Sequence, residues 1–228
     1  MEFVNVQIEE GIANITLQNG KVNAISHQLI EELNSALDQA EEAKAVVILT
    51  GQTGILSGGY DLKTMQKSMA DAMALVTEGS KLTRRMLAFP TPIITACGGH
   101  AVAKGAFLLL CSDYRIGVSG AFKIGLNEVA IGMVMHHAGI EMARGRMPIN
   151  YFNRSVINAE MFGPEQAVNA GFLDLVVEPE QLMETAKKVA TQFKTLNIRA
   201  HHGTKLKLRK ELLEAMDLAI ELDAKGSM

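Results

Sequence analysis

Cysteines, membrane-length apolar runs and export signals are all scarce in this chain. It holds two cysteines, Cys97 and Cys111, and both lie in apolar stretches, so we expect buried, reduced thiols rather than a disulfide framework. No apolar run approaches the roughly 20 residues that a membrane-spanning helix needs. The acidic N-terminus, MEFVNVQIEE, lacks the basic start and apolar segment of a secretory signal. We therefore predict a soluble protein of a reducing compartment, the cytoplasm.

An excess of positive charge is also missing. The net charge of −3 offers no broad positive field to a phosphate backbone, which argues against nucleic acid as the main partner. The phosphate-loop and Rossmann glycine signatures are absent, and no spacing of Cys, His and Asp is typical of a metal site. We therefore predict neither a metal nor a cofactor of the protein's own.

Apolar residues make up 48% of the 228 residues, which is enough to bury one large core. Residues 3–17 alternate in polarity around a Glu-Gly turn, which predicts two strands. The apolar stretches 45–51 and 92–99 predict strands buried on both faces, and residues 100–113 predict a buried helix. Strands that alternate with helices indicate an α/β fold with a largely parallel sheet.

Amphipathic patterns predict the remaining helices. Ser26 is suited to cap a helix whose apolar stripe consists of Leu29, Leu33, Leu37 and Ala40. Further helices are expected at 71–88, 164–171, 179–196 and 203–225, and further strands at 114–118 and 173–177. Core segments give way to charged helices near residue 195, so we divide the chain into an α/β core, 1–194, and a C-terminal helical region, 195–228.

One carboxylate lies in a mostly apolar stretch: Glu128, in GLNEVAIG. Two interpretations are open. It is either a structural carboxylate at a strand edge or helix start, satisfied by backbone amides, or an acid–base group whose proton affinity is raised by apolar neighbours. About twenty positions earlier, in KGAFLLLCSDYRIG, Phe107 lies among small and aliphatic residues.

The same sequence pattern occurs twice along the chain. A predicted buried strand ends in glycine and a helix begins soon afterwards, at GGYDLK and at AVAKGAF. Glycine allows a positive φ and a close approach to a ligand, and a helix start leaves N–H groups unpaired. Two such groups can converge on one oxygen as an oxyanion hole, in which one donor is typically worth about 3 kcal/mol. The alternative is that these glycines only end their strands.

Six segments, taken in order and spacing, carry a family resemblance: GKVNAIS, SGGYDLK, PIITACGGHAVAKGAF, LCSDYRI, FKIGLNEVAIGM and PEQAVNAGFLDLVVEPEQL. Over nearly its whole length the chain resembles the crotonase (enoyl-CoA hydratase/isomerase) superfamily. The resemblance implies a spiral of repeated ββα units and C-terminal helices that make a homotrimer, or a hexamer of two trimers. It also implies a coenzyme A thioester as substrate, so that coenzyme A enters with the substrate and not as a cofactor.

The resemblance assigns roles to single residues. The oxyanion donors would be the main-chain N–H groups of Tyr60 and Lys104, although many relatives have glycine where Lys104 stands. Residues implied to lie at the substrate or its coenzyme A part are Lys21, Ala24, Ile25, Gly58, Lys63, Phe107 and His136. For the two lysines among them, Lys21 and Lys63, a solvated surface position is the alternative.

Relatives that hydrate a 2-enoyl thioester have two glutamates, and here Phe107 replaces the first while Glu128 matches the second. A phenylalanine cannot orient water or accept a proton, whereas a lone glutamate is enough to move a proton from C2 to C4. The pattern is similar to Δ3,Δ2-enoyl-CoA isomerases of the mitochondrial type, which implies a role in fatty acid or related acyl-CoA metabolism. The alternatives are another crotonase-type reaction, hydration or thioester hydrolysis, and a non-catalytic trimer that binds CoA esters.

For the remaining polar residues a purely structural role is an alternative to a functional one. His136 and His137 could activate water, or one could be buried and hydrogen-bonded while the other is exposed. His100 is expected to be a turn residue bonded to the backbone. Asp61 and Asp113 are expected to cap or pair locally.

Overall fold

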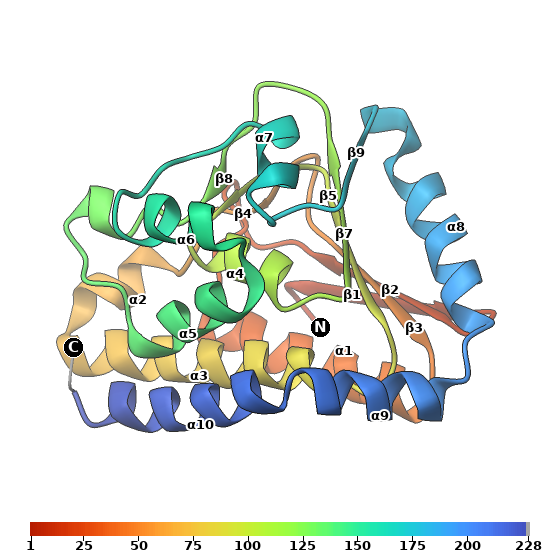
Figure 1. Ribbon diagram of the computed structural model, residues 1–228, viewed down its shortest axis with the longest axis horizontal. Helices are drawn as coiled ribbons and strands as arrows, with labels where there is room; N and C mark the ends of the chain where they lie inside the picture. Colours follow the sequence, from red (N-terminus) through yellow and green to blue (C-terminus); the bar gives the residue numbers. More distant parts are fainter. Residues whose placement is uncertain (227–228) are drawn as a thin grey trace.

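The structure, a computed structural model, describes residues 1–226, and the strands within them form two sheets (Figure 1). The larger sheet has the order β1 (Val4–Glu9), β2 (Ile12–Leu17), β3 (Val46–Thr50), β5 (Ile93–Cys97), β7 (Tyr114–Val118) and β9 (Leu175–Val177). Strands β1 and β2 pair antiparallel, and the other neighbours pair parallel. The smaller sheet consists of the parallel strands β4 (Gly54–Ser57), β6 (Gly99–Val102) and β8 (Ile124–Gly125).

The two sheets are built from a repeated unit. In the pairs β3–β4, β5–β6 and β7–β8, the first strand joins the larger sheet and the second joins the smaller one. Helices follow these pairs, as α1 (His27–Glu42) follows β1 and β2. The predicted α/β fold of repeated ββα units with a largely parallel sheet is therefore confirmed.

Helices cover both faces of the larger sheet, which explains the continuous apolar runs of its central strands. Figure 1 shows α8 (Leu182–Lys194) at one side of the sheet, away from α1 and α3 (Met69–Leu87). The small side chains Ala186 and Ala190 of α8 pack on Ile48, Ile94 and Ile116 of the strands. The larger core lies on the opposite face, beneath α1, α3 and α4 (Lys104–Leu110).

Helix α1 forms as its sequence predicts. The Ser26 side chain accepts a hydrogen bond from the Leu29 N–H at 3.2 Å, which satisfies one unpaired donor of the first turn. The predicted stripe is buried along its whole length. Asp61 caps α2 (Leu62–Lys67) in the same way, because its carboxylate accepts from the N–H of Thr64 at 3.0 Å.

The boundary expected near residue 195 lies between α8 and the C-terminal helices, and the division into two regions stays a prediction. The residues predicted as one helix, 203–225, belong to two, α9 (Ile198–Leu208) and α10 (Lys210–Ala224). Helix α10 packs along α3 and against α5 (His137–Arg146) (Figure 1). The remaining helices are α6 (Ile149–Val156), α7 (Pro164–Asn169) and the short 3-10 helices η1 (Val129–Ile131) and η2 (Pro179–Gln181).

Asp113 joins the C-terminal region to the core, and its expected structural role is confirmed. Its carboxylate accepts hydrogen bonds from the Lys205 ammonium at 2.7 Å and the Arg209 guanidinium at 2.9 Å, and from the main-chain N–H of Ile93 at 2.8 Å. All three side chains are largely buried, so the charges are paired where water does not screen them.

The prediction of one buried helix over 100–113 is wrong at its start. Residues up to Val102 form β6, because they pair with β4 on one side and β8 on the other, and the helix begins at Lys104. Both cysteines are free and buried, as expected. None of the helices within residues 1–226 is long and apolar enough to cross a membrane.

Candidate active site

Three groups singled out in the sequence follow the ends of the three strands of the smaller sheet. The strands run parallel, and Ala101 of the central strand pairs with both neighbours. The carboxyl ends of parallel strands meet at one edge, which is where α/β proteins commonly bind ligands. The chain leaves β4 toward Tyr60, β6 toward Lys104 and β8 toward Glu128, so these three residues gather at the same edge.

The turn after β4 leaves one main-chain donor free. The Ile25 N–H donates to the Gly59 carbonyl at 2.8 Å, and the Asp61 N–H donates to the Ile25 carbonyl at 2.9 Å. In this parallel bridge the N–H of Tyr60 points away from Ile25. Within residues 1–226 the Tyr60 N–H has no acceptor, so it is available to a ligand at this edge.

The turn after β6 supplies a second donor. Ala103 ends the strand with φ of 51°, a strained conformation for a residue with a side chain, and α4 begins at Lys104. The Lys104 N–H is one of the unpaired donors of that helix start, and it has no acceptor in the described part of the chain. A Cβ built on Gly59 would lie 3.1 Å from the Ala103 Cβ and 3.8 Å from the Lys104 nitrogen, so the two turns touch.

Glu128 stands immediately before η1 and is 8% exposed. Burial raises the pKa of its carboxyl from 4.5 to about 7, although a hydrogen bond from its own main chain and the charge of Lys104 act in the opposite direction. Its buried Oε2 atom has no hydrogen-bond partner within residues 1–226. Asp61 and Asp113, in contrast, accept bonds from neighbouring amides. Glu128 thus combines a near-neutral pKa with a free oxygen, as a group that exchanges protons requires.

Phe107 and His136 pack against each other. Phe107 lies on α4 and is 2% exposed, and its ring meets that of His136 edge to face, with the centroids 5.6 Å apart. Burial, aided by the positive charge of Lys104, lowers the pKa of His136 to about 4. The imidazole is therefore neutral at neutral pH. His100 is bonded to the backbone as expected, since its Nδ1 accepts from the Lys123 N–H at 3.0 Å, but it lies in strand β6 and not in a turn.

The segment expected at the coenzyme A part borders a cavity of about 480 Å³, which Lys21 and Ala24 line together with Asp61 and Thr64. Gly58 is exposed beside this segment and donates its N–H to the Val22 carbonyl at 2.8 Å. Lys63 is exposed on α2 and is not among the lining residues.

The side chain of Ile25 is fully buried, and both of its main-chain groups bridge to the turn after β4. It holds the turn in place and does not present a surface to the cavity. Asn23, to which the sequence gave no role, holds the same segment. Its buried amide donates to the carbonyls of Leu17 at 3.0 Å and Leu56 at 2.8 Å, and its φ of 51° is one that asparagine tolerates.

Asp223 is a second residue that sequence reasoning missed. It lies on α10, and its two carboxylate oxygens accept from the main-chain N–H groups of His137 at 2.8 Å and Ala138 at 3.0 Å. It therefore caps the start of α5, next to His136. No local signal marks this role, since the two partners are more than eighty positions apart.

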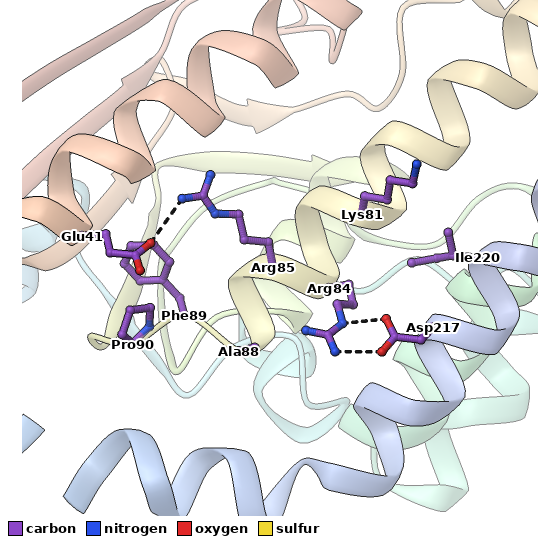
Figure 2. A pocket seen from close by; sticks show the side chains of 9 residues that line it. All are labelled: Glu41, Lys81, Arg84, Arg85, Ala88, Phe89, Pro90, Asp217 and Ile220. Atoms are coloured by element: carbon purple, nitrogen blue, oxygen red, sulfur yellow. Dashed lines mark hydrogen bonds and ion pairs between the residues drawn. The ribbon is translucent and has the colours of Figure 1, made fainter. Parts of the chain in front are cut away.

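A cavity of about 400 Å³ lies on the outer side of α3, against α1 and α10 (Figure 2). Figure 2 shows Arg84 paired with Asp217 through two bonds and Arg85 directed toward Glu41. None of the residues predicted for the site lines this cavity. Across the described residues, no group of three or more His, Cys, Asp or Glu side chains is arranged to hold a metal ion.

Comparison with known proteins gives consistent family matches. A model of the enoyl-CoA hydratase/isomerase family matches residues 7–226. A crystal structure of an enoyl-CoA hydratase/isomerase family protein from Pseudomonas syringae is 62% identical, with a TM-score of 0.97, and the match covers 98% of this chain and 97% of that one. The structure of an enoyl-CoA isomerase from Mycobacterium tuberculosis is 36% identical, with a TM-score of 0.94 over 99% of both chains.

Curated relatives are more distant and bear two kinds of name. The probable enoyl-CoA hydratase of Bacillus subtilis is 29% identical over 198 residues, which are 85% of this chain and 76% of the relative. Hydratase names are more common than isomerase names among such relatives.

Proposed function

This chain belongs to the crotonase superfamily of enoyl-CoA hydratases and isomerases, and we propose that it is an isomerase. It would convert a 3-enoyl-CoA into a 2-enoyl-CoA, in fatty acid or related acyl-CoA metabolism. The proposal goes beyond the family because relatives with hydratase names and isomerase names share the fold.

The site has the parts that such a double-bond shift needs. The N–H groups of Tyr60 and Lys104 would donate to the thioester oxygen, which becomes negative when a proton leaves C2. The Glu128 carboxylate would take that proton, and the electrons would spread over the oxygen, C2 and C4. The protonated acid would then return its proton to C4, so that no water is consumed and the glutamate ends ionised as it began.

One observation carries the proposal: a free, buried carboxylate oxygen on Glu128 follows the same sheet edge as two unpaired N–H groups, while Phe107, packed on His136, stands at the position that the resemblance gives to the first glutamate of the hydratases. Phe107 cannot bind or activate water, and the neighbouring His136 has its pKa lowered to about 4, so it does not supply an acid near neutral pH. Apolar surroundings also exclude the water that a hydration requires.

The test offers purified protein a 3-enoyl-CoA and a 2-enoyl-CoA in separate reactions. Isomerisation of the first with no water added to the second supports the proposal. Hydration or thioester cleavage would assign another crotonase-type reaction, and binding without turnover would assign a CoA-ester-binding protein. Glu128→Gln is expected to abolish turnover and leave binding of the thioester nearly unchanged, whereas Glu180→Gln, at an exposed position on η2, is the matched control.

The cavity beside Lys21 and Ala24 is proposed to take the coenzyme A end of the substrate. The side chain of Lys21 is exposed at its rim, where an ammonium can meet a phosphate. Lys21→Ala is expected to raise the KM for the CoA thioester several-fold and leave kcat unchanged, which steady-state kinetics would measure.

We also propose a homotrimer or a hexamer of two trimers. Exposed apolar side chains occur on α6 and α9, among them Ile149 and Leu208, which are 82% and 81% exposed. The molar mass from light scattering during size-exclusion chromatography tests this, and a mass near the 24.7 kDa of one chain would refute it.

A further inference from the structure

The side chain of Lys104, one of the two donor residues, runs into the interior and ends on α3. It is 1% exposed, and its Nζ atom donates to the Gly79 carbonyl at 2.5 Å and to the Thr83 hydroxyl at 3.3 Å. An ammonium has three N–H groups and a neutral amine has two, so Nζ can make both bonds in either protonation state. The attachment of Lys104 to α3 therefore does not depend on its charge.

The side chain of the other donor residue, Tyr60, reaches the same helix. Its hydroxyl donates to the Val76 carbonyl at 3.4 Å, and the Lys104 Nζ lies 5.6 Å from the centre of its ring. The ring fits against α3 because position 79 is glycine, where a Cβ would lie 2.8 Å from the ring atom Cζ. Positions 76, 79 and 83 are spaced three and four apart, so they share one face of α3. Both N–H groups are thus anchored to one helix face by the side chains of their own residues.

The two donor turns are therefore held at two places. Their main chains approach each other at Gly59 and Ala103, and their side chains end on α3. An oxyanion hole works only when both donors reach the same oxygen, at about 2.7–3.1 Å. An error of about 1 Å in such an arrangement can cost about 100-fold in rate, so whatever fixes the two turns also fixes the rate.

We propose that Gly79 and Thr83 of α3 are positioning residues of the oxyanion hole. By receiving the side chains of Tyr60 and Lys104, they set the separation and the direction of the two main-chain donors. The inference rests on the proposed function, because it takes these N–H groups as the donors to the thioester oxygen. Gly79 and Thr83 act through the donor residues and not on the substrate itself.

The first test disturbs the anchors and keeps both main-chain donors. Gly79→Ala should push the Tyr60 ring off α3 and lower kcat about tenfold to 100-fold at a nearly unchanged KM, because the oxyanion forms only after binding. Gly203→Ala is the matched control, since nothing lies within 4 Å of a Cβ built at this position of α9, and it should keep full activity.

The Thr83 hydroxyl is tested by a pair of variants. Thr83→Val removes an acceptor of Lys104 and should lower kcat several-fold, whereas Thr83→Ser keeps the hydroxyl and should retain the wild-type kcat. This pair decides the question if Gly79→Ala does not fold. A wild-type kcat in Thr83→Val, or a loss of the same size in Thr83→Ser, would overturn the proposal.

The second test needs no turnover, so it separates failure of this inference from failure of the proposed function. Butyryl-CoA, a saturated thioester, is labelled isotopically at its carbonyl and bound to the protein, and infrared difference spectroscopy measures its C=O stretching frequency. Two donors on the oxygen should lower this frequency in wild type and in Gly203→Ala. The decrease should be smaller in Gly79→Ala and Thr83→Val, which both keep the lysine, so that the change reports position and not a lost charge.

The outcomes of the infrared measurement are distinct. An equal decrease in wild type and in the two α3 variants would overturn the positioning role. No decrease in wild type would refute the two N–H groups as donors and the inference with them. A decrease that weakens in the α3 variants of a protein without isomerase activity would refute the reaction and retain the positioning role.

Discussion

Replacing Glu128 by glutamine should change the pH dependence of folding stability. Burial raises the pKa of this carboxyl from 4.5 to about 7. Between these pH values the folded protein binds more protons than the unfolded chain, so the free energy of unfolding falls as the pH rises from about 4.5 through about 7. Glutamine does not titrate, so the variant lacks this decline.

The size of the effect follows from the change in proton affinity. At about 1.4 kcal/mol for each pH unit, the rise of the pKa makes the ionised carboxylate cost about 3 kcal/mol of stability above pH 7. That is a large part of the roughly 5–15 kcal/mol by which a domain is typically stable. The difference in the free energy of unfolding between Glu128→Gln and wild type should therefore grow in favour of the variant by about 3 kcal/mol from about pH 4.5 to about pH 8. Any effect of the amide itself is the same at every pH and does not alter this change.

Urea unfolding followed by circular dichroism at several pH values measures this difference. Glu180→Gln, at an exposed glutamate, should show a nearly constant difference from wild type over the same range. A flat curve for Glu128→Gln as well would mean that Glu128 carries its charge in water, and the reasoning from burial to proton transfer would fail.

Three further substitutions probe the supports of the site. Gly59→Ala places a Cβ 3.1 Å from that of Ala103 at a φ of +111°, so turnover should fall about 100-fold or more with little change in circular dichroism; retained turnover would refute the need for contact between the turns. Asp113→Asn leaves two buried cations without their counter-charge and should cost about 3–5 kcal/mol in urea unfolding, with a cost below 1 kcal/mol contradicting the pairing. Asp223→Ala removes the cap of α5 and should cost about 1–2 kcal/mol, and an unchanged denaturation midpoint would speak against the cap.

The fold was predictable where local pattern and long-range packing agree. Helix α1 carries a capping serine and an apolar stripe, and β3 and β5 are continuous apolar runs. Each of these local patterns predicts both the element and its burial. The strands of the smaller sheet were not predictable in this way. Strand β8 has two residues, and β6 merges into an apolar helix, so only pairing with distant partners distinguishes these strands from loop or helix.

The sequence was enough to choose the residues of the candidate site, but it did not show where their side chains point. Glycine after buried strands indicated the two donor turns, and an isolated acid indicated Glu128. The path of Lys104 into the interior depends on a carbonyl and a hydroxyl of α3, at Gly79 and Thr83, which are more than twenty positions away. The sequence also did not show that Ile25 packs into the core while Lys21 and Ala24 of the same segment border the cavity.

The two donors beside the smaller sheet belong to the main chain, and this has a genetic consequence. Every codon for an amino acid other than proline encodes an N–H group, so point mutations at positions 60 and 104 rarely delete a donor. An acid at position 107, by contrast, would be carried by the side chain, so substitutions there can add or remove it while both donors remain. Gene copies can therefore diverge in the reaction they catalyse and still inherit the same means of polarising a carbonyl.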